Sequence, residues 1–240
     1  MAFRKAQRQK AKLRLAITGP AGSGKTYSAL LLAFGLGGKI AMIDTENGSG
    51  DLYCNLGDYD ICSISAPYDP RKYIQVIHEA EEAGYDTIII DSLSHAWNGE
   101  GGILDMQSKA ASSSKSGNSY TAWRLVTPYQ NRLVDSLLTS SCHIIATMRS
   151  KTDYIQTEGD YGRKEIKKVG LAPVQREGME YEFGIVFDLS AEHTVTVSKD
   201  RTSLFDKSIF TITQETGKTL RNWLDSGVSD LGEKKEEKAE

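Results

Sequence analysis

One eight-residue segment constrains this 240-residue chain more than any other feature: Gly19, Pro20, Ala21, Gly22, Ser23, Gly24, Lys25 and Thr26. It fits the pattern G-x-x-x-x-G-K-[ST], in which small residues let backbone N–H groups turn inward around a phosphate. The sequence L-R-L-A-I-T from Leu13 to Thr18 before it predicts a buried strand, and the apolar sequence from Tyr27 to Leu36 after it predicts a helix. A strand, a phosphate-binding loop and a helix in this order predict an α/β fold that binds a nucleoside triphosphate.

The loop also predicts which cofactors the protein uses. Lys25 is expected to contact the β and γ phosphates of ATP, and the Thr26 hydroxyl is expected to be one ligand of Mg²⁺. The helix that begins next to the loop, with Tyr27 in its first turn, adds the positive end of its dipole. We therefore expect ATP and Mg²⁺ as cofactors and residues 19–27 as the nucleotide-binding segment. A chance glycine-rich turn is the competing interpretation.

Composition narrows the class of protein. No apolar run approaches the roughly 20 residues of a membrane span, so a soluble protein without a membrane partner is expected. Cys54, Cys62 and Cys142 lack metal-ligand or redox spacing, and no signal peptide is recognisable, which suits a reducing cytoplasm. The formal net charge of -3 does not by itself indicate nucleic-acid binding.

The distribution of charge and of apolar residues divides the chain into three parts. Residues 1–12 form a basic N-terminal arm without acidic residues, and residues 13–227 are predicted to form one domain. Residues 228–240 end in Gly232 to Glu240, which mixes charges of both signs without an apolar anchor and predicts a flexible tail. The basic residues of the arm are Arg4, Lys5, Arg8, Lys10 and Lys12.

Strand and helix signals alternate along the central domain. Further apolar strands are predicted at Lys39–Asp44, Thr87–Asp91 and Cys142–Met148. Two helices are predicted to begin at a capping residue followed by proline, at Asp69-Pro70 and Thr127-Pro128. This order predicts a mostly parallel sheet flanked by helices. Near the C-terminus the pattern predicts an antiparallel hairpin of Phe183–Leu189 and Thr194–Lys199, and then a helix around Thr219–Leu224.

Acidic residues at two strand ends are the candidate catalytic groups. Asp91 closes an aliphatic strand, the position needed to hold Mg²⁺ beside a phosphate loop, although a structural cap is the alternative. Asp44 and Glu46 lie at the end of another strand, where a carboxylate can deprotonate the water that attacks the γ-phosphate. Spacing alone does not distinguish Asp44 from Glu46.

Two polar segments lie between the predicted elements. Ser108–Tyr120 is rich in serine, carries Lys109 and Lys115, and predicts a mobile loop. Ser150–Tyr181 is long and basic with interleaved tyrosines, which fits a loop that binds single-stranded nucleic acid. An ordinary flexible surface loop is the alternative for each. The candidate DNA-binding residues are Lys109, Lys115, Arg149, Lys151, Arg163, Lys164, Lys167 and Lys168.

The phosphate loop, the sequence I-D-T-E at 43–46 and the sequence I-I-I-D-S at 88–92 together resemble the ATPase core of RecA-type recombinases and hexameric replicative helicases. The resemblance spans roughly residues 13–202. It implies a RecA-like P-loop NTPase fold, with Glu46 as the catalytic base and with two DNA-binding loops at the two polar segments. It also implies that Lys199 and Arg201 reach the γ-phosphate in a neighbouring subunit, for which a charged surface turn is the alternative.

Departures from that family pattern narrow the expected function. The family places a glutamine at the end of the fourth strand to sense the γ-phosphate, where this chain has Thr147 as a shorter substitute. Besides the core, only the basic N-terminal arm and the charged tail are expected, without a large additional DNA-binding domain. The size of the chain, the sequence L-R-L-A-I-T-G-P-A-G-S-G-K-T near its start and the sequence V-Q-R-E-G-M-E-Y-E-F at 174–183 resemble the minimal RecA-core proteins of bacteriophages. The resemblance implies a phage-encoded ATPase in the cytoplasm of a bacterial host, which binds single-stranded DNA as a ring or filament and promotes annealing or strand exchange. A single-stranded DNA-binding protein is a further expected partner. A helicase-like motor or loader, and an ATP-gated scaffold, are the alternatives.

Overall fold

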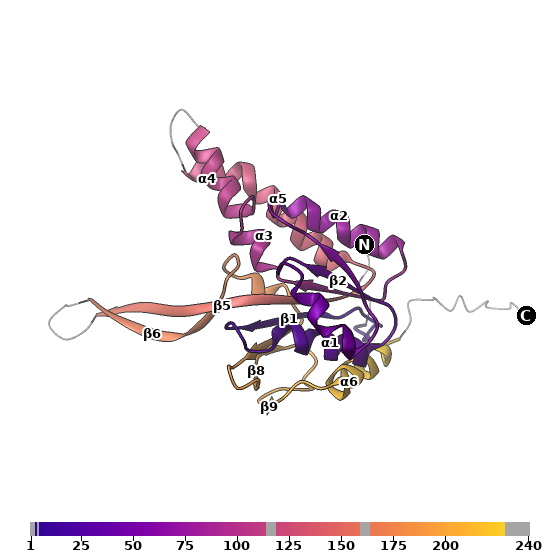
Figure 1. Cartoon of the computed structure of the whole chain (residues 1–240). Helices are drawn as coiled ribbons and strands as arrows, with labels where there is room; N and C mark the ends of the chain where they lie inside the picture. The colour runs from indigo at the N-terminus through magenta and orange to yellow at the C-terminus, as the bar shows by residue number, and fades with distance from the viewer. Residues whose placement is uncertain (1–2, 4, 114–118, 159–163, 229–240) are drawn as a thin grey trace, which may run out of the picture.

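A computed structural model describes residues 3, 5–113, 119–158 and 164–228 of the chain. A central sheet crosses the molecule, and helices pack on both of its faces (Figure 1). In these ranges no helix combines the length and the apolar character that crossing a membrane requires. The predicted fold, a mostly parallel sheet flanked by helices with antiparallel strands on its C-terminal side, is confirmed.

The strands of the sheet follow the order β3-β2-β4-β5-β1-β7-β8-β9. The first six are parallel to one another, and β8 and β9 are added antiparallel at the edge beyond β7. Because β5 lies between β1 and β4, the phosphate loop and the end of β4 are two strands apart. The strands are β1 (Arg14–Gly19), β2 (Ile40–Asp44), β3 (Asp60–Ser63), β4 (Thr87–Asp91), β5 (His143–Glu158), β6 (Lys164–Pro173), β7 (Ile185–Leu189), β8 (Val195–Asp200) and β9 (Ile209–Phe210).

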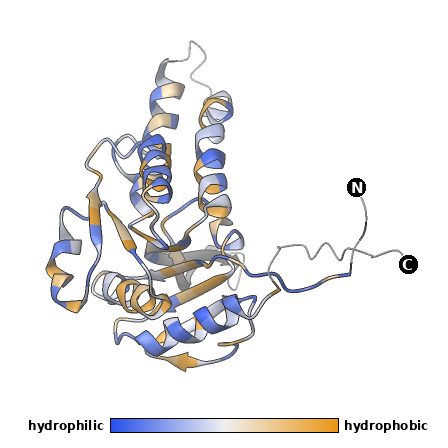
Figure 2. Cartoon of the chain, turned by 90° about the vertical axis from the view of Figure 1, so that its right-hand side faces the viewer, coloured by the Kyte–Doolittle hydropathy of each residue, from blue (hydrophilic) through white to orange (hydrophobic). Residues whose placement is uncertain are grey.

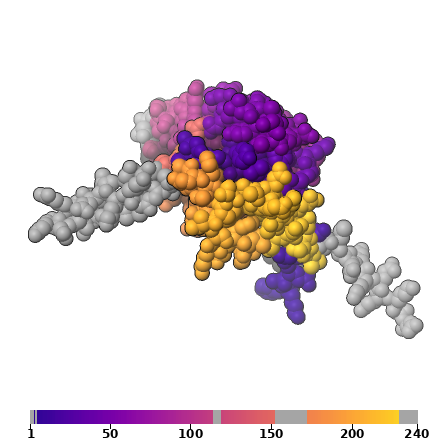
Figure 3. All heavy atoms as spheres, turned by 60° about the horizontal axis from the view of Figure 1, so that its bottom comes forward, coloured from indigo at the N-terminus to yellow at the C-terminus, as the bar shows by residue number. Residues whose placement is uncertain are grey.

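Helices complete a three-layer arrangement. Helices α1 and α6 contact each other, as do α2 and α5. The α-helices are α1 (Lys25–Leu36), α2 (Pro70–Glu82), α3 (Ser94–Asn98), α4 (Ile103–Ser113), α5 (Ser119–Thr139) and α6 (Gln214–Asp225). Two 3-10 segments, η1 (Ser49–Leu56) and η3 (Met179–Tyr181), lie in connections. Figure 3 shows the C-terminal residues, in orange and yellow, gathered on one face beside the first half of the chain.

Alternation along the buried strands creates two hydrophobic cores. Leu15 and Ile17 of β1 belong to the core under α1 and α6, whereas Ala16 between them belongs to the core under α2 and α5. Side chains of a strand point alternately to opposite faces, so a strand covered on both sides must be apolar throughout. Figure 2 shows apolar residues concentrated on the central strands. This explains why the buried strands were recognisable from sequence.

A glycine contact lets α1 and α6 pack closely. A Cβ atom added to Gly35 would lie 2.1 Å from the carbonyl oxygen of Gln214, and one added to Gly217 would lie 2.3 Å from that of Leu32. Both distances are far below van der Waals contact, so these positions accept no side chain. The contact fixes the helix that follows the phosphate loop against the C-terminal helix.

The predicted start of α2 is confirmed at atomic detail. Asp69 precedes the helix, and its side chain accepts a hydrogen bond from the backbone N–H of Arg71 at 2.9 Å, with Pro70 at the first helical position. The prediction for α5 was wrong about its start: the helix begins at Ser119 and contains Pro128 within it. Ala122 and Val126, one and two turns into the helix, are buried, and this packing continues the helix ahead of the proline.

The predicted mobile loop at Ser108–Tyr120 is also corrected. Residues 108–113 belong to α4 and residues 119–120 to α5, which pack against each other, while residues 114–118 lie outside the described ranges. The serines fit a helix because the Ser112 and Ser113 hydroxyls donate to the carbonyl oxygens four residues earlier, at 2.9 and 2.8 Å. A composition typical of loops was therefore misleading here.

Within the long segment at Ser150–Tyr181, residues 150–158 and 164–173 pair as an antiparallel hairpin where the sequence predicted a loop, and residues 159–163 lie outside the described ranges. Strand β5 continues beyond the sheet to Glu158 and pairs with β6, from Ser150 opposite Pro173 to Glu158 opposite Lys164. The hairpin extends away from the domain as an arm (Figure 1). Backbone pairing satisfies the N–H and C=O groups of this polar segment, which a sequence without an apolar pattern does not reveal.

Candidate nucleotide-binding site

The phosphate loop opens into a cavity of about 460 Å³ at the carboxyl ends of the central strands. The loop contributes Ala21, Gly22, Gly24, Lys25 and Thr26 to its wall. The other lining residues come from four further segments and are Glu46, Ser49, Tyr53, Asp91, Arg149 and Ser150. The fold thus brings together the three motifs that the sequence analysis singled out.

The phosphate loop has room and free polar groups for a phosphate. Gly22 and Gly24 adopt left-handed φ angles of 75° and 83°, and no other atom lies within 4 Å of a Cβ built on Gly22. The Ser23 hydroxyl is buried and has no hydrogen-bond partner among the described residues. These features fit a phosphate chain that would accept hydrogen bonds from the loop.

Lys25 lies at the first position of α1 and folds back over the loop. Its Nζ atom donates to the carbonyl oxygens of Gly19 and Pro20 at 3.0 and 2.8 Å. Burial lowers the pKa of Lys25, an effect that the nearby carboxylates of Asp91 and Glu46 oppose. An anionic phosphate would stabilise the charged ammonium group, and the expected role of Lys25 fits its position.

Thr26 and Asp91 meet as the magnesium prediction requires. The Asp91 carboxylate accepts the Thr26 hydroxyl at 2.5 Å on one oxygen and the Thr147 hydroxyl at 2.5 Å on the other. Asp91 is only 2% exposed, and burial raises its pKa. Among the described residues no three His, Cys, Asp or Glu side chains are arranged to hold a metal ion. A Mg²⁺ ion held here would therefore take further ligands from the nucleotide or from water.

The structure assigns different positions to Asp44 and Glu46. Asp44 is 1% exposed, and its Oδ1 atom accepts a hydrogen bond from the backbone N–H of Glu46 at 2.6 Å. Its second oxygen accepts a longer hydrogen bond from the N–H of Gly50 at 3.5 Å. Asp44 thus caps the turn after β2, while Glu46 lines the cavity. The geometry favours Glu46 as the base, as the family resemblance implied.

Arg149, one of the expected DNA-binding residues, lies in the nucleotide cavity. Its Nε atom donates to Glu46 Oε1 at 3.0 Å, and its Nη2 atom pairs with Glu46 Oε2. The physical reason is its place at the end of the central part of β5, because only β4 separates this strand from β2, which ends just before Glu46. Thr147, two residues earlier, is fully buried and holds Asp91, so it does not face the cavity as a phosphate sensor in this structure.

The other basic candidates lie apart from the cavity. Lys109 is on α4 and pairs with Asp105 at 2.7 Å. Lys151 is exposed on β5, and Lys164, Lys167 and Lys168 belong to β6. Lys115 and Arg163 lie outside the described residues. The hairpin therefore carries most of the candidate DNA-binding residues that the structure describes.

Lys199 and Arg201 lie level with the beginning of β1, whereas the phosphate loop follows the end of that strand. Asp200, between them, pairs with Ile185, which in turn pairs with Leu15 near the beginning of β1. The Nζ atom of Lys199 donates to the carbonyl oxygens of Glu180 and Tyr181 at 3.1 and 2.6 Å. Within one chain these residues are therefore remote from the nucleotide cavity.

Sequence reasoning missed two residues beside the phosphate loop. The Nδ1 atom of His193, in the turn between β7 and β8, lies 3.0 Å from the carbonyl oxygen of Ser23. Tyr53 of η1 lines the cavity and packs edge-on against Tyr27, with ring centroids 6.2 Å apart. Neither residue belongs to a motif, and only the folded connections bring them to the loop.

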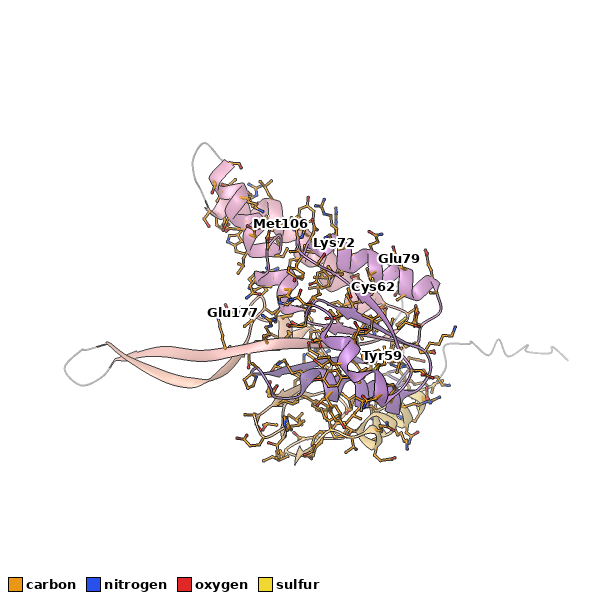
Figure 4. The ribbon with its side chains drawn as sticks, in the orientation of Figure 1. Tyr59, Cys62, Lys72, Glu79, Met106 and Glu177 are labelled. Carbon is orange, nitrogen blue, oxygen red and sulfur yellow. The ribbon has the colours of Figure 1, made fainter. Side chains whose placement is uncertain are left out.

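The cysteines lie outside this site. Cys142 is buried, and its thiol donates to the Tyr85 carbonyl oxygen at 2.8 Å, whereas Cys54 and Cys62 are exposed and free. Figure 4 places Cys62, together with Tyr59, on the side of the molecule away from the hairpin. Their positions agree with the absence of redox spacing in the sequence.

Comparison with known proteins identifies a family over nearly the whole predicted domain. A family model described as an AAA domain matches residues 11–225. A comparison with curated proteins finds no match. The matched range includes the phosphate loop, Glu46 and Asp91, and it supports the P-loop ATPase part of the resemblance seen in the sequence. On this match and this site, the chain belongs to the AAA domain family of P-loop ATPases.

Proposed function

We propose that this protein is a RecA-like recombination ATPase that binds single-stranded DNA through the β5–β6 hairpin and promotes annealing or strand exchange. One observation carries the DNA part of the proposal: strand β5 contributes residues to the wall of the nucleotide cavity and then continues into the hairpin. Ser150 lines that cavity and is also the first paired residue of the hairpin. A ligand on the hairpin would thus lie on a strand in direct contact with the nucleotide site.

The composition of the hairpin fits a nucleic-acid backbone. Strand β6 contains Lys164, Lys167 and Lys168, and β5 contains Lys151. Tyr154 on β5 adds an aromatic residue to the same arm. Cations that follow phosphates and rings that stack on bases are the two contributions that sequence-tolerant binding of single strands combines.

The cavity residues account for ATP hydrolysis. Lys25 binds the phosphates, and Thr26 and Asp91 would hold Mg²⁺, which neutralises charge that develops on the phosphate oxygens. Glu46 takes a proton from the attacking water as the bond to the γ-phosphorus forms and ADP leaves. Tyr53 and Arg149 close the wall of the cavity next to these groups.

Assembly into a ring or filament is the second part of the proposal. Lys199 and Arg201 lie at the edge of the sheet opposite their own phosphate loop, so any action on a γ-phosphate requires a second subunit. A cation supplied from a neighbour can accelerate phosphoryl transfer by about 10³ to 10⁵. Their position is what a contribution between subunits needs.

A triple lysine variant tests the DNA proposal. Replacing Lys164, Lys167 and Lys168 by glutamine should weaken binding of a single-stranded oligonucleotide. It should also flatten the dependence of log affinity on log salt, by about 0.7 for each phosphate that the variant no longer neutralises. The matched control replaces three exposed lysines away from the hairpin, Lys39, Lys207 and Lys218.

The control should keep the wild-type slope, measured by fluorescence anisotropy at several salt concentrations. Equal slopes in both triple variants and the wild type would contradict the hairpin as the binding surface. An ATPase rate that DNA does not change, with no DNA affinity in the wild type, would favour an ATP-gated scaffold instead.

A further inference from the structure

The pair between Arg149 and Glu46 occupies the nucleotide cavity itself. The guanidinium group contacts both carboxylate oxygens, and both side chains line the same 460 Å³ space as Lys25 and Asp91. The Arg149 and Glu46 side chains are 47% and 24% exposed, so neither is locked in place by burial. A pair with this geometry can open without disturbing the core.

The contact opposes the role of Glu46 as a base. A carboxylate that accepts two hydrogen bonds from a guanidinium group has both of its oxygens engaged. As long as Arg149 holds Glu46, the carboxylate is not free to orient the attacking water. The contact with Arg149 therefore holds the expected base in an inactive arrangement.

A terminal phosphate would compete for the same guanidinium group. Arginine binds phosphate oxygens through the same two-pronged geometry with which it binds carboxylates. The backbone of Arg149 is held on both sides: its N–H donates to the Ser94 hydroxyl at 2.9 Å, and its carbonyl oxygen accepts the N–H of Val174 at 2.6 Å. An exchange of partners is thus a movement of the side chain alone.

We propose that Arg149 is a positioning residue that pairs with Glu46 until ATP binds and then moves to the terminal phosphate of ATP, which releases Glu46 for catalysis. ADP lacks that phosphate and leaves the pair closed. This inference rests on the nucleotide site and not on the DNA-binding part of the proposed function. Its test therefore measures nucleotide affinity without DNA.

The test is a double-mutant cycle read by nucleotide binding. The dissociation constants of Mg²⁺-ADP and of a non-hydrolysable Mg²⁺-ATP analogue are measured for the wild type, Arg149→Met, Glu46→Gln and the double variant. Arg149→Met should weaken the analogue about tenfold, the scale expected for one charge-assisted hydrogen bond, and should change ADP affinity less than about twofold. Lys151→Met, which removes an exposed positive charge two residues along β5, is the matched control and should change neither.

Glu46→Gln distinguishes partner exchange from simple charge effects. Removal of the carboxylate frees Arg149. The affinity for the analogue should therefore rise more when Glu46→Gln is made in the wild type than when it is made in Arg149→Met, where only the loss of the negative charge acts.

A second variant tests the geometry of the contact. Arg149→Lys keeps the positive charge but not the two-pronged contact, and it should lose most of the preference for the analogue over ADP. Equal loss of both nucleotides in Arg149→Met, or an equal gain from Glu46→Gln in both backgrounds, would overturn the proposal. If Arg149→Met does not fold, the ratio of analogue affinity to ADP affinity in Arg149→Lys decides between the same two outcomes.

Discussion

The substitution Glu46→Gln should separate nucleotide binding from turnover. Glutamine keeps the shape of the side chain but cannot accept the proton of the attacking water, and loss of a general base costs about 10² to 10⁴ in rate. The stability cost is small, because the pair with Arg149 is partly exposed and such pairs contribute about 0.2 to 1 kcal/mol. The variant should therefore fold, bind ATP and hydrolyse it very slowly.

Asp44→Asn is the control that separates loss of the base from loss of stability. Asp44 is buried and accepts the backbone N–H groups of Glu46 and Gly50, and a hydrogen bond to a charged group contributes about 1.5 to 3 kcal/mol. Loss of the charge should lower the free energy of unfolding by that order and loosen the turn that positions Glu46. The main effect of Asp44→Asn should therefore be on stability, and its loss of turnover should be the smaller of the two.

Three measurements are needed for both variants: phosphate release at saturating ATP, affinity for a fluorescent ATP analogue, and urea unfolding at equilibrium. In Glu46→Gln we expect an affinity for the ATP analogue at least as high as that of the wild type, with turnover reduced at least a hundredfold. We expect a lower unfolding midpoint in Asp44→Asn. An active Glu46→Gln beside an inactive but stable Asp44→Asn would show that the base was assigned to the wrong carboxylate.

Three further outcomes are expected. Lys25→Ala should abolish ATP binding measured by calorimetry, because the phosphates lose the cation of the loop, and unchanged affinity in the folded variant would contradict the site. Burial lowers the pKa of His143 from 6.5 to about 4, and its neutral Nδ1 accepts the Leu13 N–H at 2.9 Å. The unfolded chain thus binds more protons between these values, so stability should fall by up to about 3 kcal/mol as pH drops from 6.5 to 4. His143→Gln should flatten that dependence in urea unfolding, and an unchanged slope would count against it. Mixing Arg201→Ala with Glu46→Gln should restore some turnover if the subunits share sites, and no recovery in co-assembled subunits would argue against this.

The sequence predicted the parts of the fold that depend on burial. Strands β1, β2 and β4 are covered on both faces, and their unbroken apolar runs were recognisable without structural information. The start of α2 was equally clear, because Asp69 and Pro70 act through local backbone chemistry. Local signals of this kind do not depend on which distant segments come together.

Segments stabilised by contact with another element were mistaken for loops. Helix α4 contains serines that bond to their own backbone and packs against α5, and β6 exists because the extension of β5 pairs with it. Both contacts are made with the next or the preceding element of the chain, and the composition of the segment itself does not reveal that partner. Polar composition alone therefore predicted flexibility where the structure has regular elements.

The candidate site shows the same division. Thr26 and Asp91 were predicted to lie close together, because each follows from a motif at the carboxyl end of a parallel strand. The structure confirms this contact, since the Thr26 hydroxyl donates to the Asp91 carboxylate. The side chain of Arg149 was assigned to DNA because it is basic and precedes a basic segment, yet it lies on Glu46. A side chain's direction at the end of a strand depends on which partner the neighbouring strands bring within reach, and spacing along the chain does not contain that information.

The most direct test of the proposed coupling between the hairpin and the nucleotide site is the rate of ATP hydrolysis with and without single-stranded DNA. It should be measured at saturating ATP for the wild type and for the variant that replaces Lys164, Lys167 and Lys168 by glutamine. We expect the oligonucleotide to accelerate the wild type, while the variant keeps its basal rate and loses the acceleration at the same DNA concentration. A wild-type rate that DNA leaves unchanged, or equal acceleration of both proteins, would contradict a nucleotide site coupled to DNA through the hairpin.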